Sequence, residues 1–213
     1  PDMGAYENEL GERFIGATYY VSAAGTEEGN GLLTSPFNTI QQGVDAAWNG
    51  DTVIVYPGTY EGNINFNNKS IVLASRILES GDTTYVDSTI IEGIVTIGNA
   101  VDSSALFSGF TITGDFTNRG LDILSDHNVL IERVKVIGVG GVHVNNATVK
   151  LHDIIIKQNS RTDGGGGIKM YNSTVELVNA VIDSNASTSN YGGGVMVQQS
   201  TVTMNGVEIT NNT

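Results

Sequence analysis

Hydrophobic and polar residues alternate in short runs through most of the chain. Val142-x-Val144, Val149-x-Leu151 and Ile154-x-Ile156 form one set of three such runs, with Gly and Asn between and around them. Alternation with a period of two is typical of strands, because successive side chains point to opposite faces. The pattern therefore predicts an all-β chain built from short strands and tight turns.

This set of three strands recurs at a nearly constant spacing. Val142, Ile168 and Val195 are equivalent positions, separated by 168 − 142 = 26 and 195 − 168 = 27 residues. The same turn of each unit carries an asparagine: Asn159, Asn185 and Asn212. Three strands per repeat predict the coil of a parallel β-helix, in which each coil stacks about 4.8 Å above the previous one. Stacked Asn side chains are then expected to hydrogen-bond along the axis.

The alternation continues toward the N-terminus with less regular spacing. Leu121-x-Ile123, Val95-x-Ile97, Ile71-x-Leu73 and Val53-x-Val55 are examples. We therefore expect the β-helix to span residues 51–213, in roughly six or seven coils.

The first 50 residues follow a different pattern. A strand is predicted at Tyr19–Val21, and a helix is predicted to begin at Ser35-Pro36, with an apolar stripe of Phe37, Ile40, Val44 and Ala47. Because exposed strand edges invite pairing with other chains, we expect this helix to cap the N-terminal end. The predicted organisation is a linker or tail of a preceding domain at 1–17, a strand and capping helix at 18–50, and coils from 51 that are incomplete at the C-terminus.

Charge and composition exclude several classes of protein. Lys and Arg number 10 against 23 Asp and Glu, so the net charge of −13 argues against a nucleic-acid partner. The absence of Cys excludes disulfides and thiolate metal sites. No apolar run approaches the roughly 20 residues that span a bilayer, so membrane insertion is not expected.

Outward-facing charges of opposite sign are predicted to lie on adjacent coils. The predicted rows are Asp122, His143, Lys169 and Met196; Lys150, Glu176 and Thr203; and Lys157, Asp183 and Thr210. Such pairs across neighbouring strands contribute about 0.2–1 kcal/mol each, which gives most of these charges a structural role.

The first row also suggests a ligand surface. Asp122, His143 and Lys169, beside Tyr171, could bind an acidic or neutral sugar chain. Lyases that act on uronates need a base and usually a calcium ion held by several carboxylates, and the repeat aligns no such cluster. We therefore predict no catalytic residues and a non-catalytic module. A polysaccharide lyase or glycoside hydrolase acting on acidic polysaccharide stays open as the alternative.

Two further sets of residues have both a functional and a simpler interpretation. Glu27, Glu28 and Asn30 could bind calcium, the one cofactor considered, or form a solvated acidic loop. Five asparagines match the N-glycosylation tripeptide, which turn-rich sequences also produce without glycosylation. They are Asn68, Asn146, Asn172, Asn185 and Asn211.

Three N-terminal segments carry a resemblance to a known family. Residues 20–31 (YVSAAGTEEGNG), 35–47 (SPFNTIQQGVDAA) and 50–61 (GDTVIVYPGTYE) resemble the start of a pectate-lyase-like right-handed parallel β-helix domain of large secreted or surface bacterial proteins. Residues 1–7 (PDMGAYE) are similar to the tail that closes a preceding β-helix in such proteins.

The resemblance implies a right-handed β-helix and an extracellular or cell-surface location. It does not imply one activity, because the superfamily includes lyases, hydrolases, epimerases and non-catalytic proteins. The expected partners are a polysaccharide or another surface protein. The open C-terminal coil also predicts self-association, head to tail, which would produce filaments.

Overall fold

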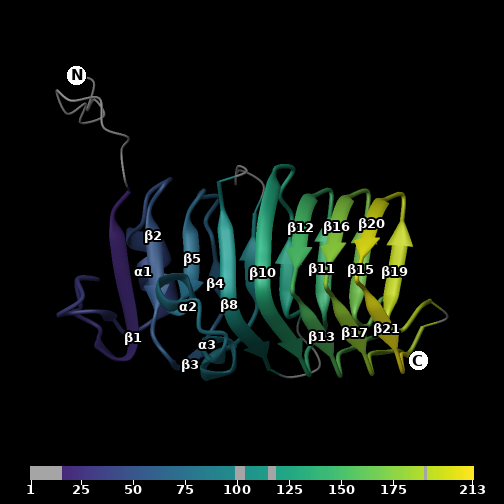
Figure 1. Ribbon diagram of the computed structural model, residues 1–213, viewed down its shortest axis with the longest axis horizontal. Coiled ribbons are helices and arrows are strands. Elements are labelled where there is room, and N and C mark those ends of the chain that lie inside the picture. The colour runs from purple at the N-terminus through teal and green to yellow at the C-terminus, as the bar shows by residue number, and fades with distance from the viewer. Residues whose placement is uncertain (1–15, 99–103, 115–118, 190) are drawn as a thin grey trace, which may run out of the picture.

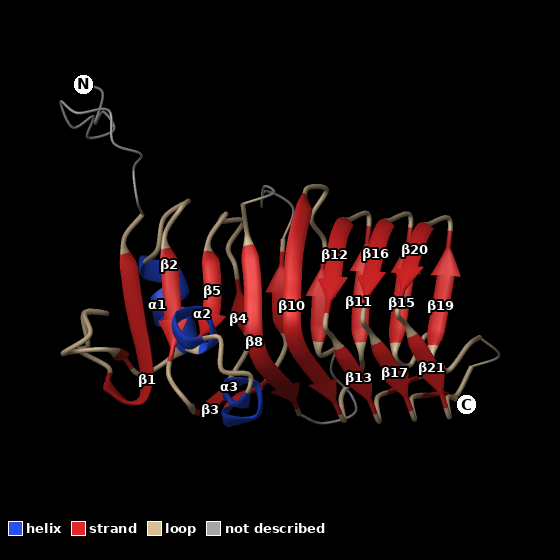
Figure 2. Ribbon diagram, in the orientation of Figure 1, coloured by secondary structure: helices blue, strands red, loops and turns tan. Residues whose placement is uncertain are grey.

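The chain folds into a right-handed parallel β-helix, an elongated stack of coils with its first and last described strands at opposite ends (Figure 1). The computed structural model describes residues 16–98, 104–114, 119–189 and 191–213. Every pairing between named strands is parallel, and Figure 2 shows strands along the whole described length, with helices only in the N-terminal part. The predicted all-β class and parallel β-helix are confirmed.

The longest path of paired strands runs from one end of the stack to the other. Its members are β1 (Thr18–Thr26), β2 (Thr52–Val55), β5 (Val72–Ser75), β8 (Leu106–Thr113), β10 (Asn128–Ile137), β12 (Thr148–His152), β16 (Thr174–Val178) and β20 (Thr201–Asn205). Seven of these strands follow residue 51, which agrees with the predicted number of coils. We call the sheet that contains this path the first sheet.

The other strands complete each coil. The first sheet also contains β3 (Gly58–Glu61), β6 (Thr89–Glu92), β13 (Ile155–Lys157), β17 (Val181–Asp183) and β21 (Glu208–Thr210). The second sheet is β4 (Ile64–Asn65), β7 (Val95–Ile97), β9 (Leu121–Ile123), β11 (Val142–Asn145), β15 (Ile168–Tyr171) and β19 (Val195–Gln198). A two-stranded sheet joins β14 (Ser160–Arg161) to β18 (Ala186–Ser187).

The sequence repeat sets the register of the C-terminal coils. Val142 lies beside Ile168, which lies beside Val195, so the spacings of 26 and 27 residues each correspond to one turn of the solenoid. Side chains that point inward at these positions are fully buried in the earlier coils, as for Val142 and Ile168. The alternation therefore defined both the strands and their inward faces correctly.

The interior is a continuous hydrophobic core with an aromatic centre. Phe107 and Phe110 of β8 stack with ring centroids 4.8 Å apart, and Phe66 meets Phe107 edge-on at 6.1 Å. All three rings are completely buried. Aromatic pairs in such geometries contribute about 0.5–1.5 kcal/mol beyond the burial of their area, so these coils are held mainly by packing.

A ladder of asparagines runs inside the C-terminal coils, as predicted. Asn159 Nδ2 donates to Asn185 Oδ1 at 2.9 Å, and Asn185 Nδ2 donates to Asn212 Oδ1 at 2.9 Å. The same oxygens also accept from the backbone amides of Asn159 and Asn185. Because Asn159 and Asn185 are almost fully buried, these bonds satisfy polar groups that would otherwise be costly to bury.

The helix near the N-terminus begins later than predicted. Helix α1 spans Ile40–Ala46, and Thr39 caps it by accepting from the Gln42 amide, while the Gln42 side chain accepts from the Thr39 amide. Phe37 forms β-bridges to β1 instead of a first helical turn. The predicted apolar stripe is confirmed for Ile40 and Val44, which are buried. Ser35 and Pro36, which were predicted to begin the helix, lie in extended chain before it. Two short helices, α2 (Ile77–Ser80) and α3 (Thr84–Ser88), were not predicted.

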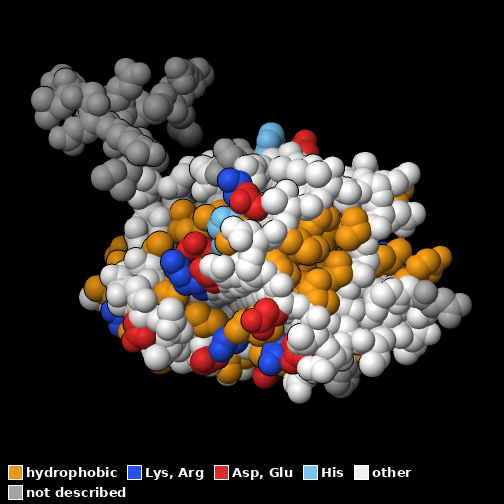
Figure 3. All heavy atoms as spheres, turned by 45° about the vertical axis from the view of Figure 1, so that its right-hand side comes forward, with side chains coloured by type: hydrophobic (Ala, Val, Ile, Leu, Met, Phe, Trp, Pro, Cys, Tyr) orange, Lys and Arg blue, Asp and Glu red, His pale blue; other side chains and the backbone are white. Residues whose placement is uncertain are grey.

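The outermost described strands at the two ends of the solenoid differ in the hydrogen-bond partners of their edges. At the N-terminal end, the Tyr20 amide of β1 donates to the Gly31 carbonyl at 2.8 Å. The side-chain amide of Gln41 in α1 imitates a neighbouring strand: it accepts from the Asn65 amide at 2.8 Å and donates to the Asn65 carbonyl at 3.1 Å. At the C-terminal end, β19, β20 and β21 each pair on one side only. Figure 3 turns this end toward the viewer and shows hydrophobic side chains gathered on it.

Candidate ligand-binding face

The predicted first row of charged residues forms on the outer face of the second sheet. Asp122 of β9, His143 of β11 and Lys169 of β15 are direct neighbours in register, followed by Met196 of β19. Parallel pairing in register brings these residues together, although 47 residues separate Asp122 from Lys169 (169 − 122 = 47). The coils therefore assemble the row that the repeat predicted.

Asp122 and His143 form a nearly buried pair. Asp122 Oδ1 lies 2.7 Å from His143 Nδ1, and Arg119 Nη1 donates to Asp122 Oδ2 at 2.9 Å. Asp122 is 9% exposed and His143 8%, so neither is the open surface residue that the row suggested. Burial alone would raise the pKa of Asp122, but the bonds and charges of His143 and Arg119 outweigh burial and lower it. Asp122 therefore stays ionised and orients the imidazole.

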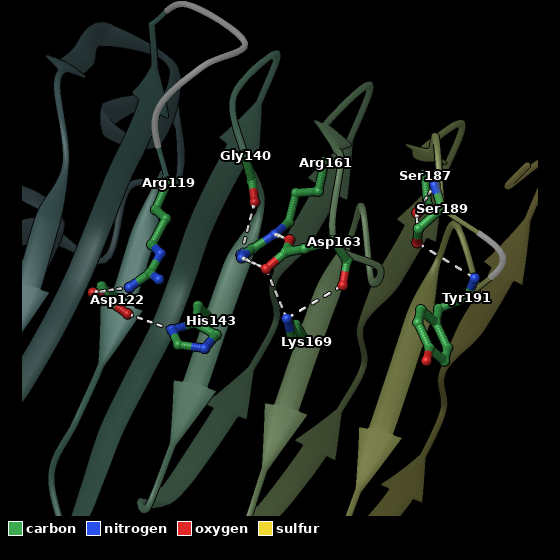
Figure 4. A network of polar contacts seen from close by, with 10 residues as sticks. All are labelled: Arg119, Asp122, Gly140, His143, Arg161, Asp163, Lys169, Ser187, Ser189 and Tyr191. Carbon is green, nitrogen blue, oxygen red and sulfur yellow. Dashed lines mark hydrogen bonds and ion pairs between the residues drawn. The ribbon is translucent and has the colours of Figure 1, made fainter.

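Lys169 bonds to neither member of this pair. Its partner is Asp163, which the repeat did not align with it. Lys169 Nζ donates to Asp163 Oδ2 at 2.7 Å, and Arg161 donates to both oxygens of the same carboxylate at 2.9 and 3.2 Å (Figure 4). The bonds from Arg161, together with Lys169, hold the pKa of Asp163 far below its usual value. Asp163 lies in the loop after β14, outside the periodic positions, which is why the spacing gave no signal for its role.

Aromatic and amide side chains border the charged network. Tyr171 is 38% exposed at the end of β15, between Asn145 and Gln198 on the neighbouring strands. Tyr191 is 62% exposed, and a Cβ on Gly164 would lie only 2.8 Å from the Cβ of Tyr191, so Tyr191 packs directly over that glycine. We call Arg119, Asp122, His143, Asp163, Lys169, Tyr171 and Tyr191 the second-sheet face.

The other two predicted rows are ion pairs between adjacent coils. Lys150 Nζ lies 3.6 Å from Glu176, and Lys157 Nζ lies 3.2 Å from Asp183. Each pair lies on the outer surface of the first sheet, where solvent weakens the attraction. Their structural interpretation is confirmed.

The remaining predicted sites are spread over the surface, with one exception. Glu27, Glu28 and Asn30 are exposed, and the part of the chain that the structure describes contains no group of three or more acidic or His residues able to hold a metal. Asn68, Asn146, Asn172 and Asn211 are exposed. Asn185 was wrong as a glycosylation candidate: it is completely buried and its amide belongs to the ladder.

The second-sheet face carries hydrogen-bonding groups, among them an imidazole whose Nδ1 lies beside a carboxylate oxygen. A carboxylate that fixes one nitrogen of an imidazole leaves the other nitrogen to act as a base, as in many hydrolases. The cations beside it are bonded to Asp122 and Asp163, so they act as fixed hydrogen-bond donors. Arg119 and Asp163 are the most accessible charged groups, with side chains 46% and 52% exposed.

Comparisons with known proteins give similarity of structure alone. No family model matches the sequence, and no curated protein matches it. One similar solved structure is pectate lyase Pel9A, with a TM-score of 0.46 and 16% identity over 82% of this chain and 55% of that one. Another is a rhamnogalacturonan lyase, with a TM-score of 0.37 and 14% identity over 90% of this chain and 56% of that one. The chain thus spans just over half the length of each.

Among the described helices, none is long and apolar enough to cross a membrane.

Proposed function

We propose that this chain is a non-catalytic extracellular or cell-surface module that binds a polysaccharide on the second-sheet face. The observation that carries the proposal is the exposed Tyr171, which lies two residues beyond Lys169 on β15 and between two amide side chains. An aromatic ring beside hydrogen-bonding groups presents an apolar surface with a polar border, which suits the face of a sugar ring.

The repeating arrangement favours an extended ligand. Asn145, Tyr171 and Gln198 occupy the same position on three successive coils, so their spacing along the axis is about 4.8 Å per coil. Arg119, whose side chain is 46% exposed, adds N–H donors beyond the one that is bonded to Asp122. A chain of sugars that runs along the solenoid axis would meet the same kinds of contact repeatedly, in keeping with an adhesive or structural role.

Binding is favoured over catalysis by the state of the charged groups. Arg161 and Lys169 both bond to Asp163, and Arg119 bonds to Asp122, so these cations are already neutralised by fixed partners. A calcium-dependent elimination needs a cluster of carboxylates, and the described residues bring none together. The proposed surface location rests on the family resemblance.

A binding assay with matched variants tests this proposal. Retention of the chain on immobilised acidic and neutral polysaccharides should fall at least about tenfold in Tyr171→Ala, which removes the platform, a loss of roughly 1.4 kcal/mol. Trp48→Ala is the control, because Trp48 is 78% exposed on another part of the surface. Equal retention of the two variants would contradict the proposal.

A polysaccharide lyase or glycoside hydrolase is the second candidate, and the Asp122–His143 pair is the observation in its favour. A lyase would release unsaturated products that absorb ultraviolet light, and a hydrolase would release reducing ends. Either signal should disappear in His143→Ala while binding persists. Product release by the unaltered chain, with or without calcium, would replace the binding proposal with this one.

A further inference from the structure

We propose that the outer face of the first sheet carries a separate binding site for a small neutral sugar. The site is a hollow of about 360 Å³ that spans β10, β12, β16 and β20, and we call it the first-sheet hollow. Its polar lining residues are Asn128, Thr148, Lys150, Thr174, Glu176 and Thr203. The inference does not depend on the polysaccharide-binding function, because none of these side chains belongs to the second-sheet face.

The register of the strands brings the lining residues together. Thr148 is the register neighbour of Asn128 on one side and of Thr174 on the other, and Lys150 is the neighbour of Glu176. On each strand the two rows lie two residues apart, so both rows project from the same face of the sheet. Successive coils therefore present hydrogen-bonding groups to one hollow at intervals of about 4.8 Å.

The uncharged side chains of the hollow have unused hydrogen-bonding capacity. Among the described residues, none bonds to the side chains of Asn128, Thr148, Thr174 or Thr203. A threonine hydroxyl both donates and accepts, and an asparagine amide does so through separate atoms. Sugar hydroxyls have the same dual capacity, so they complement this lining without displacing a bond within the protein.

The two charged residues lie near each other but are not hydrogen-bonded. Lys150 Nζ lies 3.6 Å from Glu176 Oε2, and His152 Nε2, which is buried without a hydrogen-bond partner, lies 3.8 Å from Glu176 Oε1. Both distances are too long for a hydrogen bond. The side chains of Lys150 and Glu176 are each 41% exposed. The carboxylate can therefore accept from a sugar hydroxyl, and the ammonium can donate to one, as charge-assisted bonds.

Charge and size select a small neutral ligand. The opposite charges of Lys150 and Glu176 leave the hollow without net charge, and a carboxylate on the ligand would be repelled by Glu176. The volume lies at the lower end of the roughly 300–1,000 Å³ of small-molecule sites, which suits about one or two sugar units. Leu130, which is partly buried and is the register neighbour of Lys150, adds an apolar contact for the C–H groups of a sugar ring.

The polar lining is a local feature of these coils. In the preceding coils the row that contains Lys150 holds Val72, Leu106 and Leu130 instead. Those coils have the same parallel pairing, so the solenoid itself does not require polar side chains at these positions. The row changes from apolar to charged where the hollow lies.

NMR titration of the full isotope-labelled chain with free glucose, galactose and mannose tests the proposal. Amide signals of β12 and β16 should shift progressively for at least one sugar, with a dissociation constant in the millimolar range, because the ligand is small and its bonds are few. Binding this weak would not retain the chain on an immobilised polysaccharide, so the hollow and the second-sheet face are tested separately. Shifts confined to the second-sheet face, or none with any sugar, would overturn the proposal.

Matched uronates test the preference for a neutral ligand. Glucuronate and galacturonate differ from glucose and galactose by a carboxylate at the terminal carbon, and they should bind at least about threefold more weakly because of Glu176. Glu176→Gln removes this negative charge and should diminish the preference. Uronates that bind the unaltered chain as well as the neutral sugars, or a preference unchanged in Glu176→Gln, would contradict the proposed ligand class.

Matched valine substitutions locate the site. Thr148→Val and Thr174→Val each remove a hydroxyl and keep a β-branched side chain that suits a strand, so each should weaken binding about two- to tenfold, the contribution of one hydrogen bond. Thr52→Val makes the same change on β2 of the same sheet, outside the hollow, and should have no effect. Tyr171→Ala, which alters the second-sheet face, should also leave this binding unchanged. Binding unaffected by both hollow variants, or equally weakened by Thr52→Val, would refute the site.

Discussion

The N-terminal and C-terminal halves build the same coil by different means. In residues 16–98 and in β8, large side chains such as Phe66 and Phe107 fill the interior, and helices interrupt the strands. From residue 142 onward, each coil repeats the previous one, with small aliphatic residues inside and an asparagine at one turn. The first half is stabilised by packing that occurs once, and the second by contacts that recur from coil to coil.

This difference has an energetic consequence. A unique aromatic cluster concentrates stability at one place, where a single substitution removes many contacts. A ladder distributes stability over neighbouring coils, because Asn159 and Asn185 each bond to the coil before and the coil after their own. Substitutions in the aromatic cluster and in the asparagine ladder test this comparison.

The largest loss is expected in the aromatic cluster. Phe107→Ala should reduce the free energy of unfolding by about 3–5 kcal/mol, because it leaves a cavity among fully buried rings. Chemical denaturation followed by circular dichroism measures this loss. Phe107→Leu, which keeps most of the volume, should cost clearly less, and equal losses would mean that packing is not the dominant contribution there.

Breaking the ladder should cost somewhat less but affect more coils. Asn185→Ala removes the donors to Ile156 and Asn212 and the acceptor for Asn159, for an expected loss of about 2–3 kcal/mol. Hydrogen exchange should quicken in the coils on both sides. Asn172→Gly, in the exposed pair with Asn146, is the control: glycine keeps the left-handed backbone of Asn172 (φ 46°), so stability should change by under about 0.5 kcal/mol. Exchange confined to one coil would contradict the ladder's coupling role.

The two hydrogen bonds between the Gln41 side chain and the backbone of Asn65 should contribute about 1 kcal/mol to the free energy of unfolding. Gln41→Ala leaves the amide and carbonyl of Asn65 to water. Gln41→Glu keeps the acceptor for the amide but places a carboxylate against Asp45, whose Oδ1 accepts from Gln41 Nε2 at 2.8 Å, so it should be no more stable than Gln41→Ala. Identical stability of all three would show that α1 does not protect this edge.

Acid should weaken the C-terminal half through Asp183. Hydrogen bonds from Asn211, Thr210 and Lys157 lower the pKa of Asp183 to about 2. A carboxyl with a depressed pKa in the folded state stabilises the fold above its unfolded pKa of about 3.9, and this contribution disappears as the pH falls toward about 2. Denaturation across that range should therefore show a smaller pH dependence in Asp183→Asn. An unchanged pH dependence would argue against these bonds.

The smallest effect is expected where two like charges face each other. Glu61 of β3 and Glu92 of β6 are register neighbours on the outer surface, and they are the one like-charged pair among the register pairs of the described strands. Glu92→Lys should create the complementary arrangement seen in the C-terminal coils and raise stability by about 0.2–1 kcal/mol. Glu92→Gln should give part of the gain, and a loss of stability in either variant would contradict this account.

The repeating half was largely predictable from sequence, and the non-periodic segments were not. The positions of Val142, Ile168 and Val195 fix the register because a slip of one residue would expose every inward side chain. The contact of Lys169 with Asp163 could not be predicted, since Asp163 lies in a loop whose course does not follow the repeat. Helices α2 and α3 escaped prediction because they are too short to show an apolar stripe.

The asparagine ladder also determines how the solenoid would respond to a pulling force. Its bonds lie along the axis beside the backbone bonds between coils, so traction at Thr213 first loads the bonds of the last described coil, among them the link from Asn185 to Asn212. Coils would then peel off singly, each releasing about 26–27 residues, or roughly 90 Å of extended chain. The result is a sawtooth of similar steps that ends where the ladder does, at the aromatic coils, which would yield together as one larger block.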